Sequence, residues 1–169
     1  MKKIKTLVNN SFLFETEKFE DERGYFMEIW NHQKFELPSF VQDNLSKSFK
    51  GVLRGLHYQL SPKSQGKLVR CSYGEIYDVI VDLREYSSSF GKWFGVKLDK
   101  PEVLLWIPPG IAHGFYTLSN TAEIQYKVTN YFDPVYERVL MWNDKQLGIN
   151  WPIYKDPIIS KKDLNQAIT

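Results

Sequence analysis

Apolar and polar residues alternate with a period of two along several short segments of this chain. In residues 77–83 the apolar odd positions share one face, while Asp78 and Asp82 lie on the other. Residues 94–98 and 123–129 repeat the alternation, which is typical of β-strands. Turn-forming residues separate the segments, at positions 87–89, 99–101, 108–110 and 119–120. Short strands at close spacing predict an antiparallel β-sandwich or barrel.

Helical signals are few and short. Residues 31–37 predict one helix, which Pro38 would end. Near the C-terminus, Ser160 is followed three residues later by Asp163, as in a capping box, which predicts a short helix to about Ala167. The chain has no glycine-rich phosphate loop and no alternation of strands with helices, so a nicotinamide-binding domain is not expected.

Composition narrows the class of protein further. The chain has 169 residues, of which 43% are hydrophobic and 25% charged, without repeats or linkers, so residues 1–169 are expected to form one domain. Aromatic residues reach 15%; they favour strands and also line sugar and nucleotide sites. The net charge of +2 argues against binding nucleic acid. We expect a cytoplasmic protein without membrane contact, because no signal peptide or membrane-length apolar run is present.

The three histidines are His32, His57 and His113. His32 lies in a polar stretch and is expected at the surface. Strict alternation would place Arg54 and His57 on opposite faces of a strand, but a bulge at Gly55 would turn both toward one pocket. The alternative is an exposed arginine beside a hydrogen-bonded core histidine.

His113 follows a Pro-Pro-Gly turn at 108–110 and precedes Gly114. This pattern predicts a turn at the barrel rim where a ligand approaches closely; the alternative is a histidine that only braces its turn. No His-x-His pair occurs, and two isolated histidines make a poor transition-metal site. We therefore expect no metal.

Three further residues each have two interpretations. Tyr126 should point inward, so its hydroxyl is either a core hydrogen-bonding group or a general acid. Lys67 opens a strand after a turn and is either solvated or functional. Cys71, the only cysteine, excludes a disulfide within the chain and is expected to be a small buried side chain rather than a nucleophile.

Several motifs combine into a recognisable order. They are Arg54-Gly55-Leu56-His57-Tyr58-Gln59, Gln65-Gly66-Lys67-Leu68-Val69-Arg70, Trp106-Ile107-Pro108-Pro109-Gly110, Ala112-His113-Gly114-Phe115, Tyr126-Lys127 and Leu147-Gly148-Ile149-Asn150-Trp151-Pro152. In this order they resemble the dTDP-4-dehydrorhamnose 3,5-epimerase family. With residues 21–24 and 41–44, the resemblance runs from about residue 10 to residue 163. Each motif alone has little specificity, whereas five or more in register are highly specific.

The resemblance implies an all-β double-stranded β-helix, or cupin-type jelly roll, with short peripheral helices. It also implies a homodimer that exchanges its N-terminal arms and an enzyme without metal or other cofactor. The implied reaction inverts C3 and C5 of dTDP-4-dehydro-6-deoxy-D-glucose and gives dTDP-4-dehydro-L-rhamnose, a step of rhamnose biosynthesis for cell-surface polysaccharide.

The family's functional residues transfer one by one. His57 resembles the general base, Asp163 the carboxylate that pairs with it, Lys67 the group near the keto oxygen and Tyr126 the general acid. The residues that resemble nucleotide-sugar contacts are Arg23, Glu28, Gln42, Asn44, Arg54, His113, Phe132, Glu137 and Lys162. Those at 23 and 28 would come from the partner subunit.

Two departures from the family are visible. Phe132 stands where the family usually has a tyrosine that stacks on thymine, and residues 139–142 differ from the usual sequence after Glu137-Arg138.

Three other functions stay open. They are an epimerase of one carbon or of another nucleotide sugar such as a GDP-linked one, a metal-dependent cupin enzyme, and a non-catalytic sugar-binding cupin. Asp163 also has two roles open to it, as a helix cap and as the partner of His57.

Overall fold

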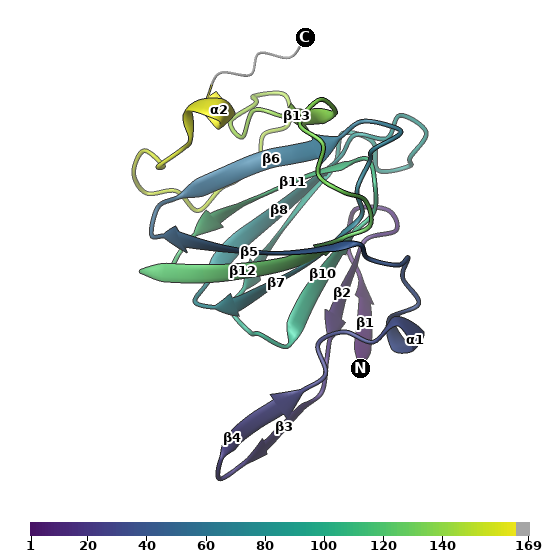
Figure 1. Cartoon of the computed structure of the whole chain (residues 1–169). Helices are drawn as coiled ribbons and strands as arrows, with labels where there is room; N and C mark the ends of the chain where they lie inside the picture. The colour runs from purple at the N-terminus through teal and green to yellow at the C-terminus, as the bar shows by residue number, and fades with distance from the viewer. Residues whose placement is uncertain (165–169) are drawn as a thin grey trace.

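The computed structural model describes residues 1–164 and consists mainly of two antiparallel sheets that face each other (Figure 1). The larger sheet has the order β1 (Lys2–Lys5), β2 (Phe12–Glu15), β10 (Val103–Ile107), β7 (Lys67–Tyr73), β12 (Thr121–Val128), β5 (Gln42–Phe49). The smaller has the order β13 (Glu137–Val139), β6 (Leu53–Gln59), β11 (Ile111–Thr117), β8 (Ile76–Asp82), β9 (Trp93–Leu98). The prediction of an all-β fold is confirmed.

The main core fills the space between the two sheets. It takes Val69 and Ile124 from the larger sheet and Ile80 and Phe115 from the smaller. A second cluster covers the outer face of the smaller sheet, where the segment that contains Leu140 and Trp151 packs on β8 and β11. The smaller sheet is therefore buried on both faces. Packing on both sides fixes the position of its strands and so of the side chains that they direct toward the interior.

Burial on both faces changes the meaning of the alternation in β8. The expected faces are present, because Tyr77, Val79 and Val81 pack under the C-terminal segment while Ile76 and Ile80 join the main core. However, the polar positions of β8 do not face solvent. Asp78 and Asp82 are both 0% exposed. A buried carboxylate needs charged or hydrogen-bonding partners, so each of these two residues has a specific environment.

Both predicted helices occur, in shorter form. Helix α1 (His32–Phe35) has Asn31 as its N-cap, whose side chain accepts hydrogen bonds from the backbone of Gln33 and Lys34. It ends at Glu36, which has a left-handed conformation with φ 53°, before Pro38 is reached. Helix α2 (Lys161–Leu164) begins after Ser160 as predicted. The predicted extension to Ala167 lies outside the described residues.

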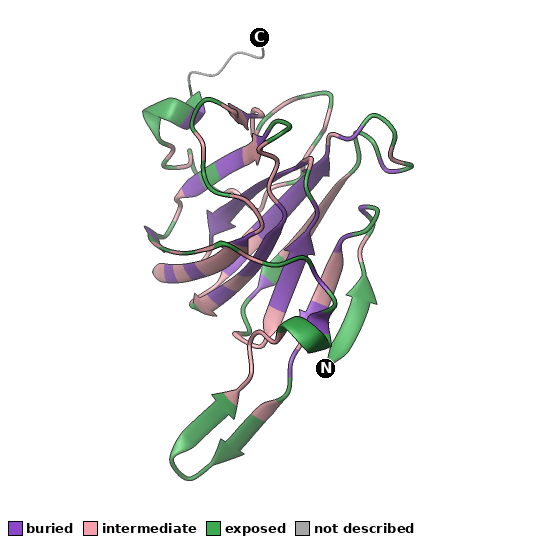
Figure 2. Cartoon of the chain, turned by 45° about the vertical axis from the view of Figure 1, so that its right-hand side comes forward, coloured by how far each residue is buried: buried purple, intermediate pink, exposed green. Residues whose placement is uncertain are grey.

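A two-stranded hairpin projects from the body of the molecule (Figures 1 and 2). Its strands are β3 (Lys18–Asp21) and β4 (Gly24–Met27). It exposes three aromatic side chains, because Phe19, Tyr25 and Phe26 are 56%, 54% and 69% exposed. A lone hairpin with large exposed apolar groups is marginally stable in water, so these three aromatic side chains form an unusual exposed surface. Within residues 1–164, no helix is long and apolar enough to span a membrane.

Candidate active site

One end of the space between the sheets is open and forms a cavity of about 220 Å³. Its lining residues come from both sheets and from the loops beside them: Ser46, Arg54, His57, Gln65, Lys67, His113, Gly114, Phe115, Tyr126, Phe132 and Glu137. Lys67 and His113 are buried at its floor, whereas Arg54 and Phe132 are exposed at its mouth. Seven residues that the sequence singled out therefore meet here, and Ser46 and Gln65 join them without having been predicted.

A bulge in β6 brings Arg54 and His57 to the same cavity. His57 pairs with His113 of β11 and Arg54 pairs with Phe115, so β6 has one residue more than β11 between these pairs. Gly55 sits in the bulge with φ +108°. Opposite it, a Cβ on Gly114 would lie 2.5 Å from the carbonyl oxygen of Arg54. The predicted bulge is confirmed, and glycine is required at both positions.

The imidazole of His57 lies between two carboxylates. Its Nδ1 is 2.9 Å from Oε1 of Glu137, within hydrogen-bonding distance. Its Nε2 is 3.1 Å from Oδ1 of Asp163, an ion-pair distance at which the contact falls outside hydrogen-bond geometry. Glu137 is bound in turn by the ammonium of Lys162. Both ring nitrogens are thus occupied, and only a ring with two N–H groups satisfies both partners.

These contacts shift the pKa of all three groups. Burial by itself would lower the pKa of His57, but its contacts with Asp163 and Glu137 outweigh burial and raise it. Burial likewise favours neutral carboxyls, yet the pairing with His57 lowers the pKa of both Asp163 and Glu137. The site therefore favours an imidazolium held between two carboxylates while the cavity contains no substrate.

Asp163 combines the two roles that its sequence left open. The backbone N–H of Asp163 donates to Oγ of Ser160, so the serine caps α2. The Asp163 side chain points instead to the barrel, where Oδ1 meets His57 and Oδ2 accepts a hydrogen bond from the backbone N–H of Gly55. The cap thus uses the backbone of Asp163, and the pairing with His57 uses its carboxylate.

Lys67 is buried rather than solvated. It starts β7 with its side chain toward the interior, where it is 7% exposed. Its ammonium donates to the carbonyl oxygen of His57 at 2.9 Å. Burial lowers the pKa of Lys67 to about 8, although the charges of Asp78 and Glu137 oppose this effect. Lys67 is therefore a desolvated cation at the cavity floor.

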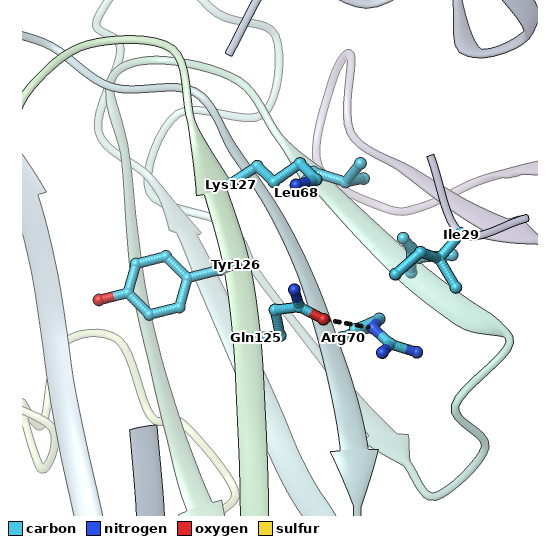
Figure 3. Close-up of a pocket in the computed structure, with 7 residues that line it drawn as sticks. Ile29, Leu68, Arg70, Gln125, Tyr126 and Lys127 are labelled. Atoms are coloured by element: carbon cyan, nitrogen blue, oxygen red, sulfur yellow. Dashed lines mark hydrogen bonds between the residues drawn. The ribbon is translucent and has the colours of Figure 1, made fainter. Parts of the chain in front are cut away.

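Tyr126 points into the barrel, as the alternation in β12 predicted. Figure 3 shows its ring on one side of β12 and the side chains of Gln125 and Arg70 on the other. On that outer side, Arg70 donates to Gln125 at 3.0 Å. Burial raises the pKa of Tyr126, while the nearby charge of Arg54 acts in the opposite direction. The phenol thus keeps its proton at neutral pH.

His113 is not at a rim turn, which corrects one expectation. The turn at 108–110 exists, but His113 lies inside β11, and all seven residues of this strand are buried. The small size of Gly114 allows the close approach of β6. His113 Nε2 is 2.8 Å from Oδ2 of Asp78. Sequence reasoning missed Asp78, although an acid flanked by Ile76, Tyr77, Val79 and Ile80 is a signal of a buried, paired carboxylate.

The remaining predicted contacts divide into two groups. Gln42 accepts from the backbone N–H of Phe132 at 3.2 Å and donates to Asn44 at 2.8 Å, so this pair supports one side of the mouth. The Lys162 ammonium lies 5.8 Å from the centre of the Phe132 ring. These residues adjoin the cavity and add a basic and an aromatic group to its entrance.

Arg23 and Glu28 lie away from this cavity. Arg23 sits in the turn of the projecting hairpin and pairs with Asp21. Glu28 follows the hairpin and pairs with Lys34 at 2.7 Å. Neither residue lines the cavity of its own chain.

Two further expectations concern reactive groups. Cys71 is buried, and burial raises the pKa of its thiol to about 11, so it is an inert core side chain as expected. His32 is exposed, also as expected. Within the described part of the chain, no group of three or more His, Cys, Asp or Glu side chains is arranged to hold a metal ion. That the site works without metal stays a prediction.

The fold and cavity define a cupin-type jelly roll with an acid–base cluster in its interior. Residues 5–168 match the model of the family described as dTDP-4-dehydrorhamnose 3,5-epimerase. The protein of that name from Shigella flexneri is 52% identical over 171 residues, which cover 98% of this chain and 94% of the relative. The chain therefore belongs to the dTDP-4-dehydrorhamnose 3,5-epimerase family, and it is an epimerase.

Solved structures agree with this assignment. The dTDP-6-deoxy-D-glucose-3,5-epimerase of Legionella pneumophila, in complex with dTDP-4-keto-L-rhamnose, is 44% identical, with a TM-score of 0.92 over 96% of this chain and 89% of that one. ChmJ of Streptomyces bikiniensis, a 3'-monoepimerase in complex with dTDP-quinovose, is 29% identical, with a TM-score of 0.89 over 96% and 85%. The jelly-roll prediction is confirmed.

Proposed function

We propose that this chain converts dTDP-4-dehydro-6-deoxy-D-glucose into dTDP-4-dehydro-L-rhamnose by inverting C3 and C5. The observation that carries the proposal is the cavity itself, which combines a histidine between carboxylates, a buried ammonium and a half-buried phenol. The keto group at C4 acidifies the C–H bonds on both neighbouring carbons. Inversion then needs a base, a stabiliser for the enolate and an acid, and no redox step.

His57 acts as the base. Proton removal requires one ring nitrogen with a free lone pair. Asp163 is only 4% exposed and is also bound by Gly55, so it stays on Nε2 and fixes the tautomer. Nδ1 is therefore the atom that takes the proton, and Glu137 must leave it when the sugar enters. Glu137 has an alternative partner at the mouth in Lys162.

Lys67 stabilises the enolate. When the proton leaves carbon, the electron pair moves toward the C4 oxygen, which becomes negatively charged. A desolvated ammonium at the cavity floor stabilises this charge more than a solvated one would, because no water competes with it. The hydrogen bond of Lys67 to the His57 carbonyl also links the position of the cation to that of the base.

Tyr126 delivers a new proton to the enolate, after which His57 releases the proton that it took and Tyr126 regains one from solvent. It is carried by β12 of the larger sheet, whereas His57 is carried by β6 of the smaller one, so the two groups reach the cavity from different sheets. Removal on one face of the sugar and delivery on the other is the requirement of inversion. The raised pKa of Tyr126 keeps its hydroxyl protonated until the enolate is present.

The dTDP part of the substrate binds at the mouth, where Phe132 offers an aromatic face for thymine, and Arg54 and Lys162 offer positive charge to the diphosphate. The partner subunit's hairpin would supply the residues at positions 23 and 28, so the active form is a homodimer with exchanged arms. The aromatic surface of the hairpin and the exposed Leu45 and Phe49 of β5 support this assembly. The cytoplasmic location stays a prediction.

The competing function is epimerisation at a single carbon, which the similarity to a 3'-monoepimerase favours. Incubation with dTDP-4-keto-6-deoxyglucose in deuterium oxide, followed by NMR of the product, separates the possibilities. Our proposal predicts deuterium at both C3 and C5. Label at one carbon would establish a monoepimerase, and binding without label would make the protein a sugar-binding cupin.

A further inference from the structure

A second buried acid lies beside the catalytic groups and has no assigned role. Asp78 belongs to β8, in the middle of the smaller sheet, and is 0% exposed. Its Oδ2 is 2.8 Å from Nε2 of His113, and its Oδ1 has no hydrogen-bond partner among residues 1–164. Burying a carboxylate with one unpaired oxygen costs free energy, so packing in the core does not by itself explain why an aspartate occupies position 78.

We infer that Asp78 is a positioning residue for the proposed epimerisation, on which this inference rests. It holds the imidazole of His113 in one orientation and keeps the ammonium of Lys67 charged at the floor of the cavity.

The geometry with His113 fixes which nitrogen faces the cavity. His113 pairs with Ile80 of β8, and Asp78 lies two residues away on the same face, the diagonal spacing at which side chains of neighbouring strands meet. A carboxylate only accepts hydrogen bonds, so Nε2 of His113 carries the proton that it donates to Asp78. Nδ1 is left to contact the sugar.

The effect on Lys67 follows from charge. Burial destabilises the ammonium and lowers its pKa to about 8, and the negative charge of Asp78 is the larger of the two that oppose this effect. The titratable and charged groups that face this end of the barrel are Asp78 on β8, Arg54 and His57 on β6, His113 on β11, Tyr126 on β12, Glu137 on β13 and Asp163 on α2. Of the two carboxylates whose charges act on Lys67, Glu137 is bound by Lys162 and His57, whereas Asp78 keeps one oxygen without a hydrogen-bond partner.

The test is Asp78→Asn, which keeps the size and an oxygen for His113 but removes the charge. We expect the alkaline limb of the kcat profile to move down by about one pH unit, because an opposite charge shifts a pKa by about one to three units. At pH 7.5 kcat should fall about threefold, and at pH 9, above both midpoints, about tenfold, with KM little changed. The matched control is Asp82→Asn, a buried acid of the same strand that pairs with Arg84, which should lower thermal stability and leave the pH profile unshifted.

A measurement without substrate separates this inference from the proposed function. NMR of 13C-labelled lysine, assigned with Lys67→Gln, follows the titration of Lys67 directly. We expect a midpoint near pH 8 in the wild type and about one unit lower in Asp78→Asn. Equal midpoints would overturn the inference even in an active enzyme, and a lowered midpoint would support it even if no deuterium entered the sugar.

A second variant covers the case in which Asp78→Asn does not fold. Lys67→Gln with Asp78→Asn removes both charges together, which leaves no unpaired ion in the core. If Asp78 acts through Lys67, the double variant should exchange deuterium as slowly as Lys67→Gln alone. A further fall of tenfold or more in the double variant would contradict this role.

Discussion

At the scale of single residues, His57 differs from a free histidine because carboxylates occupy both of its ring nitrogens. A base must be neutral, so the raised pKa means that activity falls as the pH falls through a value above the ordinary 6.5. The same pairing stabilises the fold while His57 is protonated. That contribution to the free energy of unfolding is present below about pH 6.5 and is lost as the pH rises through the raised pKa.

Glu137→Gln should move the acid limb of the kcat/KM profile to lower pH, because the Glu137 carboxylate helps to raise the pKa of His57. The free enzyme would then reach its neutral, active form at a lower pH. Steady-state kinetics between pH 5 and pH 8 measure the shift, which falls in the range of about one pH unit. An acid limb at the wild-type position would show that Glu137 does not contact His57 in solution.

Asp163→Asn should lower kcat by a factor on the order of 10²–10⁴. An uncharged amide does not stabilise the imidazolium of His57, and because it can also donate a hydrogen bond it allows the wrong tautomer of the His57 ring. The melting temperature should change little, since the cap of α2 uses the backbone N–H of Asp163, which asparagine keeps. The control is Ser160→Ala, which removes the cap, costs about 1 kcal/mol of stability and leaves kcat unchanged. Loss of folding in Asp163→Asn with normal turnover per folded molecule would assign the carboxylate a structural role only.

At the scale of elements, the β6 bulge carries the site. Gly114→Ala places a Cβ 2.5 Å from the carbonyl oxygen of Arg54 and 3.2 Å from Cα of Gly55. We expect a loss of about 1–3 kcal/mol in the free energy of unfolding and a fall in kcat of the folded protein, because the bulge sets the direction of His57. Denaturant titration and kinetics measure the two effects.

The control for this variant is Gly91→Ala, at a position with φ +72° and no atom within 4 Å. It should cost about 1 kcal/mol through backbone conformation alone and preserve kcat. A Gly114→Ala protein with wild-type kcat would show that the bulge does not orient the base.

The sequence allowed the strands, their faces and the bulge to be predicted, because these follow from local period and from glycine. Tyr126 is on the face where alternation placed it, and Cys71 is buried as expected. The pairing of His57 with Glu137 was not predictable, since it joins residues 80 positions apart through a strand of only three residues. Asp78 was missed because alternation alone does not reveal that a sheet is covered on both faces.

At the scale of the whole molecule, arm exchange makes each site depend on two chains. A heterodimer of an Arg23→Ala subunit and a His57→Ala subunit, purified with two tags, would then contain one intact site and one site with both changes. Its kcat/KM should be about half that of the wild type, whereas each variant homodimer stays low. If the arms are not exchanged, no site in the heterodimer is intact, and activity would stay at the level of the homodimers.

The account centres on His57 as the base for both carbons, and solvent exchange tests this most directly. Wild-type protein and His57→Ala are each incubated with dTDP-4-keto-6-deoxyglucose in deuterium oxide, and NMR follows label at C3 and C5. A circular dichroism spectrum confirms that the variant is folded. The account predicts label at both carbons with the wild type and at neither with His57→Ala. Exchange by His57→Ala at the wild-type rate would contradict it.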